Sequence, residues 1–374
     1  MQFSGGTGHA AMARGGLEET QCRQGWKGVR CHIEFSCTQR CLKNAALFAT
    51  DVRWKMANHA IVELNSLPPA MSFASLTRLL ILAALWGGSF LFMRIISPEL
   101  GASATAFGRA ALGAFGLIAL VAIMRVPMRF KGRFLATLAL GAINSGLPFL
   151  LFAWASRSLP TGYSAILNAT TPLMAVAVGS LVFGERVTGA KILGVLLGVA
   201  GVAVLTGAAP LSAPLQAAGG ITACLLATAC YALAGFLTTR WIAQRGGLDS
   251  RLVALGSQAG AMLLLLPFAA WQLAQEPIAL QRVPAGVWWS LLALGMLCTS
   301  LGYVLYFRLI ADVGALKALT VTFVIPLFGL FWGWLVLDEP VGWAHGVGGG
   351  LIAVALWLVL RISSMPTTRR TKAA

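Results

Sequence analysis

Residues 163–186 read YSAILNATTPLMAVAVGSLVFGER, an apolar run with a proline at its centre and a glutamate near its end. The same pattern returns at residues 317–340 as KALTVTFVIPLFGLFWGWLVLDEP. The matching residues, each pair 154 positions apart, are Pro172 and Pro326, Glu185 and Glu339, and Gly194 and Gly348. An offset kept through a helix, the loop after it and the next helix indicates an internal duplication. The chain therefore contains two copies of one unit.

The composition identifies the unit as membrane-embedded, because 58% of the residues are hydrophobic and only 11% are charged. Apolar stretches of about 20 residues recur, each long enough to cross a hydrocarbon core of roughly 30 Å. They are continuous rather than alternating, which indicates helices and not a barrel. The stretches lie near 75–96, 102–124, 134–156, 161–183, 190–208, 217–239, 252–274, 285–307, 314–337 and 343–361.

An all-α integral membrane protein with ten transmembrane helices follows from this pattern. Five crossings per copy place the second copy upside down relative to the first, which gives two inverted five-helix repeats. We predict a first repeat at residues 71–208, a second at 217–361 and a short basic tail at 362–374.

Residues 1–70 do not share the pattern of the repeats and contain no apolar run typical of a signal peptide. The spacing of their four cysteines matches no usual zinc arrangement, so we expect neither a metal site nor a cofactor here. We interpret this part as an extension outside the functional unit and expect translation to begin at Met71, with Met56 as the alternative.

The net charge of +16 raises the question of a nucleic-acid partner, but the distribution of the charges argues against one. Lysine and arginine concentrate in alternate loops, which is the pattern that orients membrane proteins with basic loops in the cytoplasm. This bias predicts both termini in the cytoplasm. The basic loops carry Arg125, Arg129, Lys131 and Arg133, then Arg186 and Lys191, then Arg240, Arg245 and Arg251, then Arg308, and finally Arg361, Arg369, Arg370 and Lys372.

Arg109 is the most informative charge, because it lies about seven residues, or roughly 10 Å, into the second predicted helix. An arginine at that depth usually faces protein or a water-filled cavity, although its long side chain also permits snorkelling to the surface. Snorkelling fits Lys317 at least as well, since it lies close to a helix end. In the first helix, Trp86 and Ser89 flank two glycines and fit either a cavity wall or close helix packing.

Three predicted helices share a polar residue four positions before a proline, and the proline frees the carbonyl of that residue. Interrupted helices at matching places in two halves are a sequence indicator of a transporter's binding site. The alternative is a plain kink in which neighbouring hydroxyls satisfy the freed carbonyl. The pairs are Asn144 with Pro148, Asn168 with Pro172, and Thr322 with Pro326.

Two further features concern helix faces. Tyr303 belongs to a hydroxyl cluster in the eighth predicted helix, which suits a polar lining. Gly194 with Gly198, and Gly346 with Gly350, form steps of small residues that predict close helix packing.

The predicted helix cores contain no Asp or Glu, and the chain has no nucleotide-binding loop, metal-ligand cluster or nucleophile–base pair. An enzyme is therefore not expected. A cavity that holds Arg109 and no carboxylate favours anionic or zwitterionic solutes, whose carboxylate could pair with the guanidinium.

The segments TGYSAILNATTPLMAVAVGSLVFGERVTGAKILGVLLGVAGVAVL and VGALKALTVTFVIPLFGLFWGWLVLDEPVGWAHGVGGGLIAVAL resemble the repeated unit of EamA-type carriers in the drug/metabolite transporter superfamily. Trp86 and Arg109 match other marks of that family. The resemblance covers about residues 75–361. It implies ten helices in two inverted repeats, transport of metabolites, and no energy source beyond solute or ion gradients.

We therefore predict a secondary transporter that exports small polar metabolites such as amino acids by alternating access. Its partners would be the solute and the lipid bilayer, in the inner membrane if the cell is Gram-negative; a homo-oligomer is left open. The alternatives are a non-transporting sensor or scaffold and an integral-membrane enzyme. The predicted solute-binding residues are Trp86, Ser89, Arg109, Asn144, Asn168, Thr171, Pro172, Tyr303, Thr320, Thr322 and Pro326.

Overall fold

A computed structural model describes residues 72–185, 187–207, 214–277, 280–314, 318 and 320–363. All of these belong to the second of two compact units, Met71–Ala374. The predictions for residues 1–70, for Lys317 and for the tail from residue 364 concern residues outside this description.

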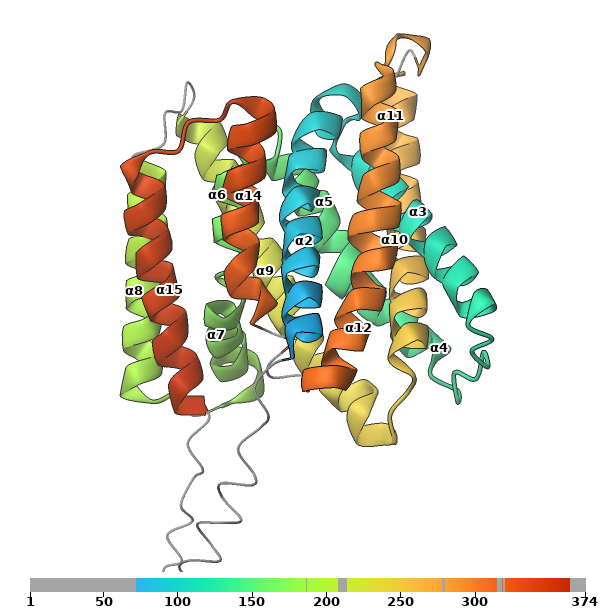
Figure 1. The fold of residues 1–374 in the computed structure, drawn as a ribbon, viewed down its shortest axis with the longest axis horizontal. Helices are drawn as coiled ribbons and strands as arrows, with labels where there is room; N and C mark the ends of the chain where they lie inside the picture. Colours follow the sequence, from blue (N-terminus) through green and yellow to red (C-terminus); the bar gives the residue numbers. More distant parts are fainter. Residues whose placement is uncertain are drawn as a thin grey trace, which may run out of the picture. The chain divides into compact units, whose positions relative to one another are not determined.

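Every secondary-structure element in the described part of the chain is a helix. The α-helices are α2 (Phe73–Leu100), α3 (Ala102–Ile123), α4 (Phe134–Gly141), α5 (Leu147–Ala155), α6 (Thr161–Asn168), α7 (Thr171–Phe183), α8 (Gly189–Gly207), α9 (Pro214–Trp241), α10 (Ser250–Gln275), α11 (Ala285–Leu292), α12 (Gly302–Val313), α14 (Val321–Leu337) and α15 (Trp343–Ser363). Short π or 3₁₀ segments are η1 (Ala142–Gly146), η2 (Ala243–Arg245), η3 (Leu280–Arg282) and η4 (Ala293–Leu301). Figure 1 shows their arrangement.

Six of these helical stretches are long and apolar enough to cross a membrane, and α6 with α7, bent by 43°, would add a seventh. Three shorter apolar helices lie at Lys191–Leu205, Val321–Leu337 and Trp343–Leu358. Large apolar side chains also face outward, as with Leu181, which is 86% exposed. In lipid such exposure has no hydrophobic cost. The prediction of an all-helical, multi-pass membrane protein is confirmed, while the count of ten spans stays a prediction.

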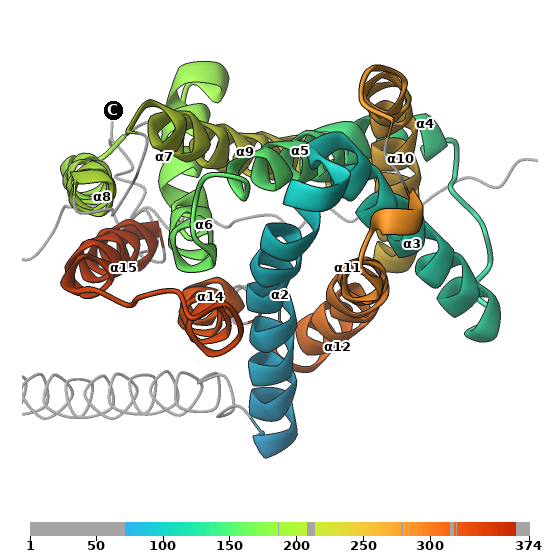
Figure 2. The same ribbon diagram turned by 90° about the horizontal axis from the view of Figure 1, so that it is seen from above.

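Helix α2 lies between α14 on one side and α12 on the other (Figure 2). Gly87 makes this possible, because a Cβ atom there would lie 2.7 Å from the Cβ of Phe328 on α14. The Trp332 indole N–H then donates to the Ala84 carbonyl at 3.0 Å. Small residues in α2 thus bring the two helices together, as the packing interpretation of this stretch predicted.

Helices α8 and α15 lie side by side in both views (Figures 1 and 2). Added Cβ atoms at Gly201 and Gly348 would each lie under 3 Å from the other glycine's carbonyl oxygen, at 2.7 and 2.8 Å. Gly346 and Gly350 were predicted to pack against another helix, but a Cβ atom added at either would meet nothing within 4 Å. Close packing through glycines was predicted for both helices, but α15 makes this contact through Gly348 and not through Gly346 or Gly350.

Two of the predicted proline interruptions differ from expectation. Pro148 is preceded by the wide turn η1, in which the Leu147 N–H donates to the Ala142 carbonyl five residues back. Pro326 lies inside the continuous helix α14, so the break between α6 and α7 has no equivalent at that position. The prediction of matching breaks at the two central prolines was therefore wrong.

Candidate functional site

A cavity of about 290 Å³ lies among α2, α3, α5, α6, α7, α9, α12 and α14, with η1 and η4 completing its wall. Seven aromatic rings line it, together with hydroxyl and amide side chains from both halves of the sequence. Among the described lining residues Arg109 is the one charged side chain. The cavity is thus largely apolar with a few convergent polar groups, which is typical of a small-molecule site.

Eight of the eleven residues predicted to bind the solute line this cavity: Trp86, Ser89, Arg109, Asn144, Asn168, Thr171, Tyr303 and Thr322. The structure therefore brings together side chains that are up to 236 positions apart in the chain. Pro172, Thr320 and Pro326 are not in the lining. Each of these three is adjacent or nearly adjacent to a lining residue, and Thr320 immediately precedes α14 as its N-cap residue.

Arg109 enters the cavity from the middle of α3 and is only 8% exposed. Its Nε donates to Thr299 Oγ1 at 3.3 Å, and its guanidinium carbon lies 3.8 Å from the centre of the Phe149 ring. The remaining close polar atom is the sulfur of Met93, 3.6 Å from Nη1. No ion pair of the described residues includes Arg109. The guanidinium is therefore buried against a ring and a hydroxyl, without a counter-ion among the described residues.

Hydroxyl groups close to the cavity occupy backbone carbonyls that the helices leave open. Thr171 Oγ1 donates to the Asn168 carbonyl at 2.7 Å, and this is the carbonyl that Pro172 frees. Thr299 Oγ1 likewise donates to the Leu294 carbonyl within the π-helical segment η4. For Asn168 the alternative of a kink satisfied by a neighbouring hydroxyl is correct. What the bend offers to the cavity is the Asn168 side chain.

The model of the EamA-like transporter family matches twice, at residues 75–207 and 218–361. The chain belongs to the EamA-like transporter family. It is therefore a multi-pass membrane transporter, and the family to which its repeated segments were compared is the correct one.

Similar proteins come from several bacteria. "Uncharacterized transporter YoaV" of Bacillus subtilis is 22% identical, over 73% of this chain and 92% of the relative. "Probable terminal-alkyne amino-acid exporter" of Streptantibioticus cattleyicolor is 24% identical over 74% and 90%. "Probable amino-acid metabolite efflux pump" of Salmonella typhimurium is 25% identical over 75% and 92%. One solved crystal structure shares the fold, with a TM-score of 0.51 and 17% identity over 78% of this chain and 99% of that one.

The EamA-like transporter also contains lining residues that were not predicted, and for two of them the sequence carried a signal. Phe149 and Phe152 lie 154 positions before Tyr303 and Tyr306, and all four line the cavity. The offset that revealed the duplication therefore also pairs aromatic residues of the wall. Met93 carries no such signal, because nothing in the sequence distinguishes it from other apolar residues of α2.

Behind the wall of this transporter lies a buried amide, Gln258 on α10, that sequence reasoning missed. Its Nε2 donates to Ser145 Oγ at 3.1 Å and to the Tyr303 hydroxyl at 3.5 Å. Its Oε1 is buried and has no partner among the described residues. Gln258 thus links η1 to α12 and supports the tyrosine that faces the cavity.

Proposed function

We propose that this EamA-like transporter is a secondary carrier that exports small anionic or zwitterionic metabolites, amino acids among them, through the cavity around Arg109. The observation that carries the proposal is the state of that arginine. The guanidinium is 8% exposed and lacks a carboxylate partner among the described residues. Its buried charge is therefore uncompensated, and binding of an anion would be favourable. A solute carboxylate would compensate the charge of Arg109 and accept two charge-assisted hydrogen bonds from it.

The rest of the cavity supports a solute with an apolar part. Seven aromatic rings line about 290 Å³, a volume in the range of a small metabolite rather than a drug-sized molecule. Trp86 and Tyr306 form one wall, with ring centres 5.2 Å apart. Asn144, Asn168 and Thr322 add neutral hydrogen-bonding groups for an amino or hydroxyl substituent.

The transport cycle we propose rests on two inverted five-helix repeats that cross the membrane ten times. Residues at the 154-position offset meet at the cavity from both copies, as expected for a site on the axis between inverted repeats. The pairs are Asn144 with Cys298, Phe149 with Tyr303, Phe152 with Tyr306, Asn168 with Thr322, and Thr171 with Ile325. Rocking of one repeat against the other would expose the cavity to each side in turn.

The orientation follows from the basic loops. The loop between α3 and α4 and the loop between α9 and α10 are rich in arginine, so we propose that both face the cytoplasm, with both termini. The turn between α2 and α3 then faces the opposite side. In a Gram-negative cell the membrane would be the inner one. The names of the relatives from Streptantibioticus and Salmonella, which refer to amino-acid export, agree with this proposal.

A screen of secreted metabolites tests the proposal. Cells that overproduce the full chain should accumulate one or a few small carboxylate-bearing solutes in the medium, and cells that overproduce Arg109→Met should not. Arg129→Met is a matched control, because Arg129 is an exposed loop arginine. Resistance to ethidium or a similar lipophilic cation that persists in Arg109→Met would contradict the proposal.

A further inference from the structure

The proposed cycle leaves unused the two glutamates by which the duplication was recognised. Glu185 follows α7 and Glu339 follows α14, each after a residue with a left-handed backbone, Gly184 (φ 66°) and Asp338 (φ 51°). The duplicated sequence therefore ends each helix in the same way.

The local geometry of the two glutamates is also the same. The backbone N–H of Glu185 donates to the Gly179 carbonyl at 2.9 Å, and that of Glu339 donates to the Gly333 carbonyl at 3.1 Å. The carboxylate of Glu185 lies close to Gly179 and that of Glu339 close to Gly333. A Cβ atom added at either glycine would collide with Oε2 of the glutamate. Glycine at both positions therefore leaves room for the carboxylate to fold back along its helix.

Glu339 uses this position to bind the first turn of α6. Both of its carboxylate oxygens accept from the Thr161 backbone N–H, at 3.0 and 2.8 Å, and Oε1 also accepts from the Thr161 hydroxyl at 3.2 Å. The residue before the helix is Pro160, which has no side chain that could cap it. The second copy of the unit therefore supplies the N-cap of a helix in the first copy, where a carboxylate is favoured by the helix dipole.

Arg94 extends the contact to two more helices. Its Nε lies 3.8 Å from Glu339 Oε1, and its Nη1 donates to the Ser156 carbonyl at 2.7 Å. The Ser156 hydroxyl in turn lies 3.1 Å from the Met93 carbonyl and 3.2 Å from Ser97 Oγ. Glu339, Arg94, Ser156 and Thr161, which we call the clasp, thus join the loop after α14 to the ends of α2, α5 and α6.

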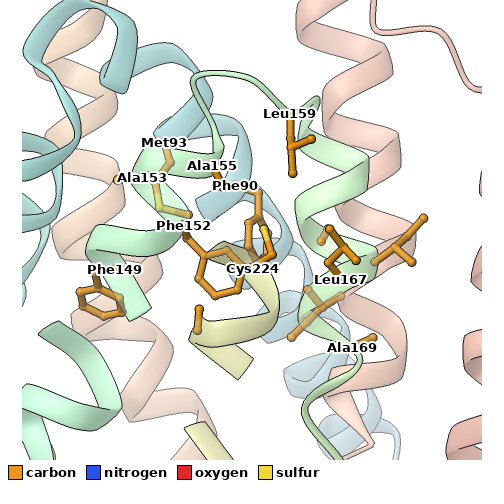
Figure 3. Close-up of a cluster of buried hydrophobic side chains, with 14 of the residues drawn as sticks. Phe90, Met93, Phe149, Phe152, Ala153, Ala155, Leu159, Leu167, Ala169 and Cys224 are labelled. Carbon is orange, nitrogen blue, oxygen red and sulfur yellow. The ribbon is translucent and has the colours of Figure 1, made fainter. Parts of the chain in front are cut away.

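The clasp and an apolar layer lie at the α2–α3 end of the molecule. In that layer Phe90 on α2 meets Phe152 on α5 edge-to-face, with ring centres 5.3 Å apart (Figure 3). Every residue of α6 from 161 to 167 is buried. In α7, which continues toward the other end, the buried residues are Leu173 and Gly179.

We propose that Glu339 is the residue that closes this end of the carrier, and that Glu185 does the same at the opposite end in the alternate state. The proposal rests on the alternating-access cycle proposed above. Inversion of the second copy puts the two glutamates at opposite ends. In the described part of the chain the Glu185 carboxylate makes no hydrogen bond or ion pair, as expected when the other end is closed. The position equivalent to Thr161 is Ala315, outside the described residues.

A cysteine-accessibility experiment tests this without knowledge of the solute. The probe is Ala155→Cys in a full-length chain whose seven native cysteines are replaced by alanine, because Ala155 is fully buried next to the clasp. A membrane-impermeant thiol reagent is added on the side of the α2–α3 turn. Glu339→Gln should speed labelling about tenfold, equivalent to a shift of about 1.4 kcal/mol between the two states. Glu276→Gln is the control, since Glu276 is an exposed carboxylate at the same end.

Glu185→Gln should have the opposite effect and slow labelling, and the double variant should return toward the parent rate. Arg94→Gln is a second test of the clasp should Glu339→Gln fail to insert. The proposal would be overturned if Glu339→Gln and Arg94→Gln were labelled at the parent rate while size-exclusion chromatography showed both variants to be folded. Glu339 would then be a helix cap only. Faster labelling in Glu185→Gln would overturn the role of the second glutamate. Because no solute is used, either result stands apart from a failure of the proposed export function.

Discussion

Replacement of Arg109 by methionine or lysine gives the most informative prediction. Methionine keeps much of the side-chain length but removes the charge and all five donors, whereas lysine keeps the charge and loses the planar fork. A charge-assisted hydrogen bond contributes about 1.5 kcal/mol at the low end of the measured range. Arg109→Met, which loses both hydrogen bonds to the carboxylate, should raise the Kd for a carboxylate-bearing solute roughly 150-fold. Arg109→Lys, which loses one of them, should raise it about tenfold.

The assay is equilibrium binding to purified protein in detergent, for the amino acid that the secretion screen selects and for the amine that lacks its carboxylate. Arg109→Met should weaken binding of the amino acid strongly and leave binding of the amine almost unchanged. Thermal stability should change little, since the arginine is held by one hydroxyl, one sulfur and the Phe149 ring, without a carboxylate partner among the described residues. An equal loss for both solutes, or a large drop in melting temperature, would refute the reasoning and make Arg109 a structural residue.

Three further predictions concern the helices and the extension. Pro326→Ala restores a backbone donor inside α14 and should stabilise the helix while it lowers transport about tenfold, and Pro172→Ala should also lower transport. Wild-type flux in both variants would show that the prolines are ordinary kinks. Gly141→Ala should lower the melting temperature by several degrees, since its Cβ would collide with the Ser257 backbone, and Gly350→Ala should not; equal melting temperatures would contradict the packing of α4 on α10. Deletion of residues 1–70 should leave expression and transport intact, because the family match begins at residue 75, and loss of folded protein would show that the extension is required.

The membrane class and the long apolar helices could be predicted, because lipid leaves a sequence few options other than continuous apolar helices. The polar lining was also largely predictable. Burying a charged residue such as Arg109 in a membrane costs free energy, so its presence there indicates a function. The 154-residue offset in addition pairs positions such as Asn168 and Thr322, which line the same cavity.

Features that depend on how helices meet could not be predicted. Pro326 was expected to interrupt its helix, but a proline allows either a break or a bend, and the neighbours decide between them. The rotation of α15 that brings Gly348 and not Gly350 onto α8 is likewise set by packing. Thr161, which Glu339 caps, lies 178 positions away from it, and no periodicity within one helix reports such a contact.

Solute exchange in proteoliposomes is the most direct test of the central claim, that this chain alone moves carboxylate-bearing metabolites through the Arg109 cavity. Vesicles that contain the purified full-length protein and are loaded with the unlabelled amino acid should take up the labelled amino acid. They should take up the decarboxylated amine far more slowly. Vesicles with Arg109→Met should take up the labelled amino acid no faster than vesicles without protein. Uptake of the amine at the same rate as the amino acid, or uptake of neither above empty vesicles, would contradict the account.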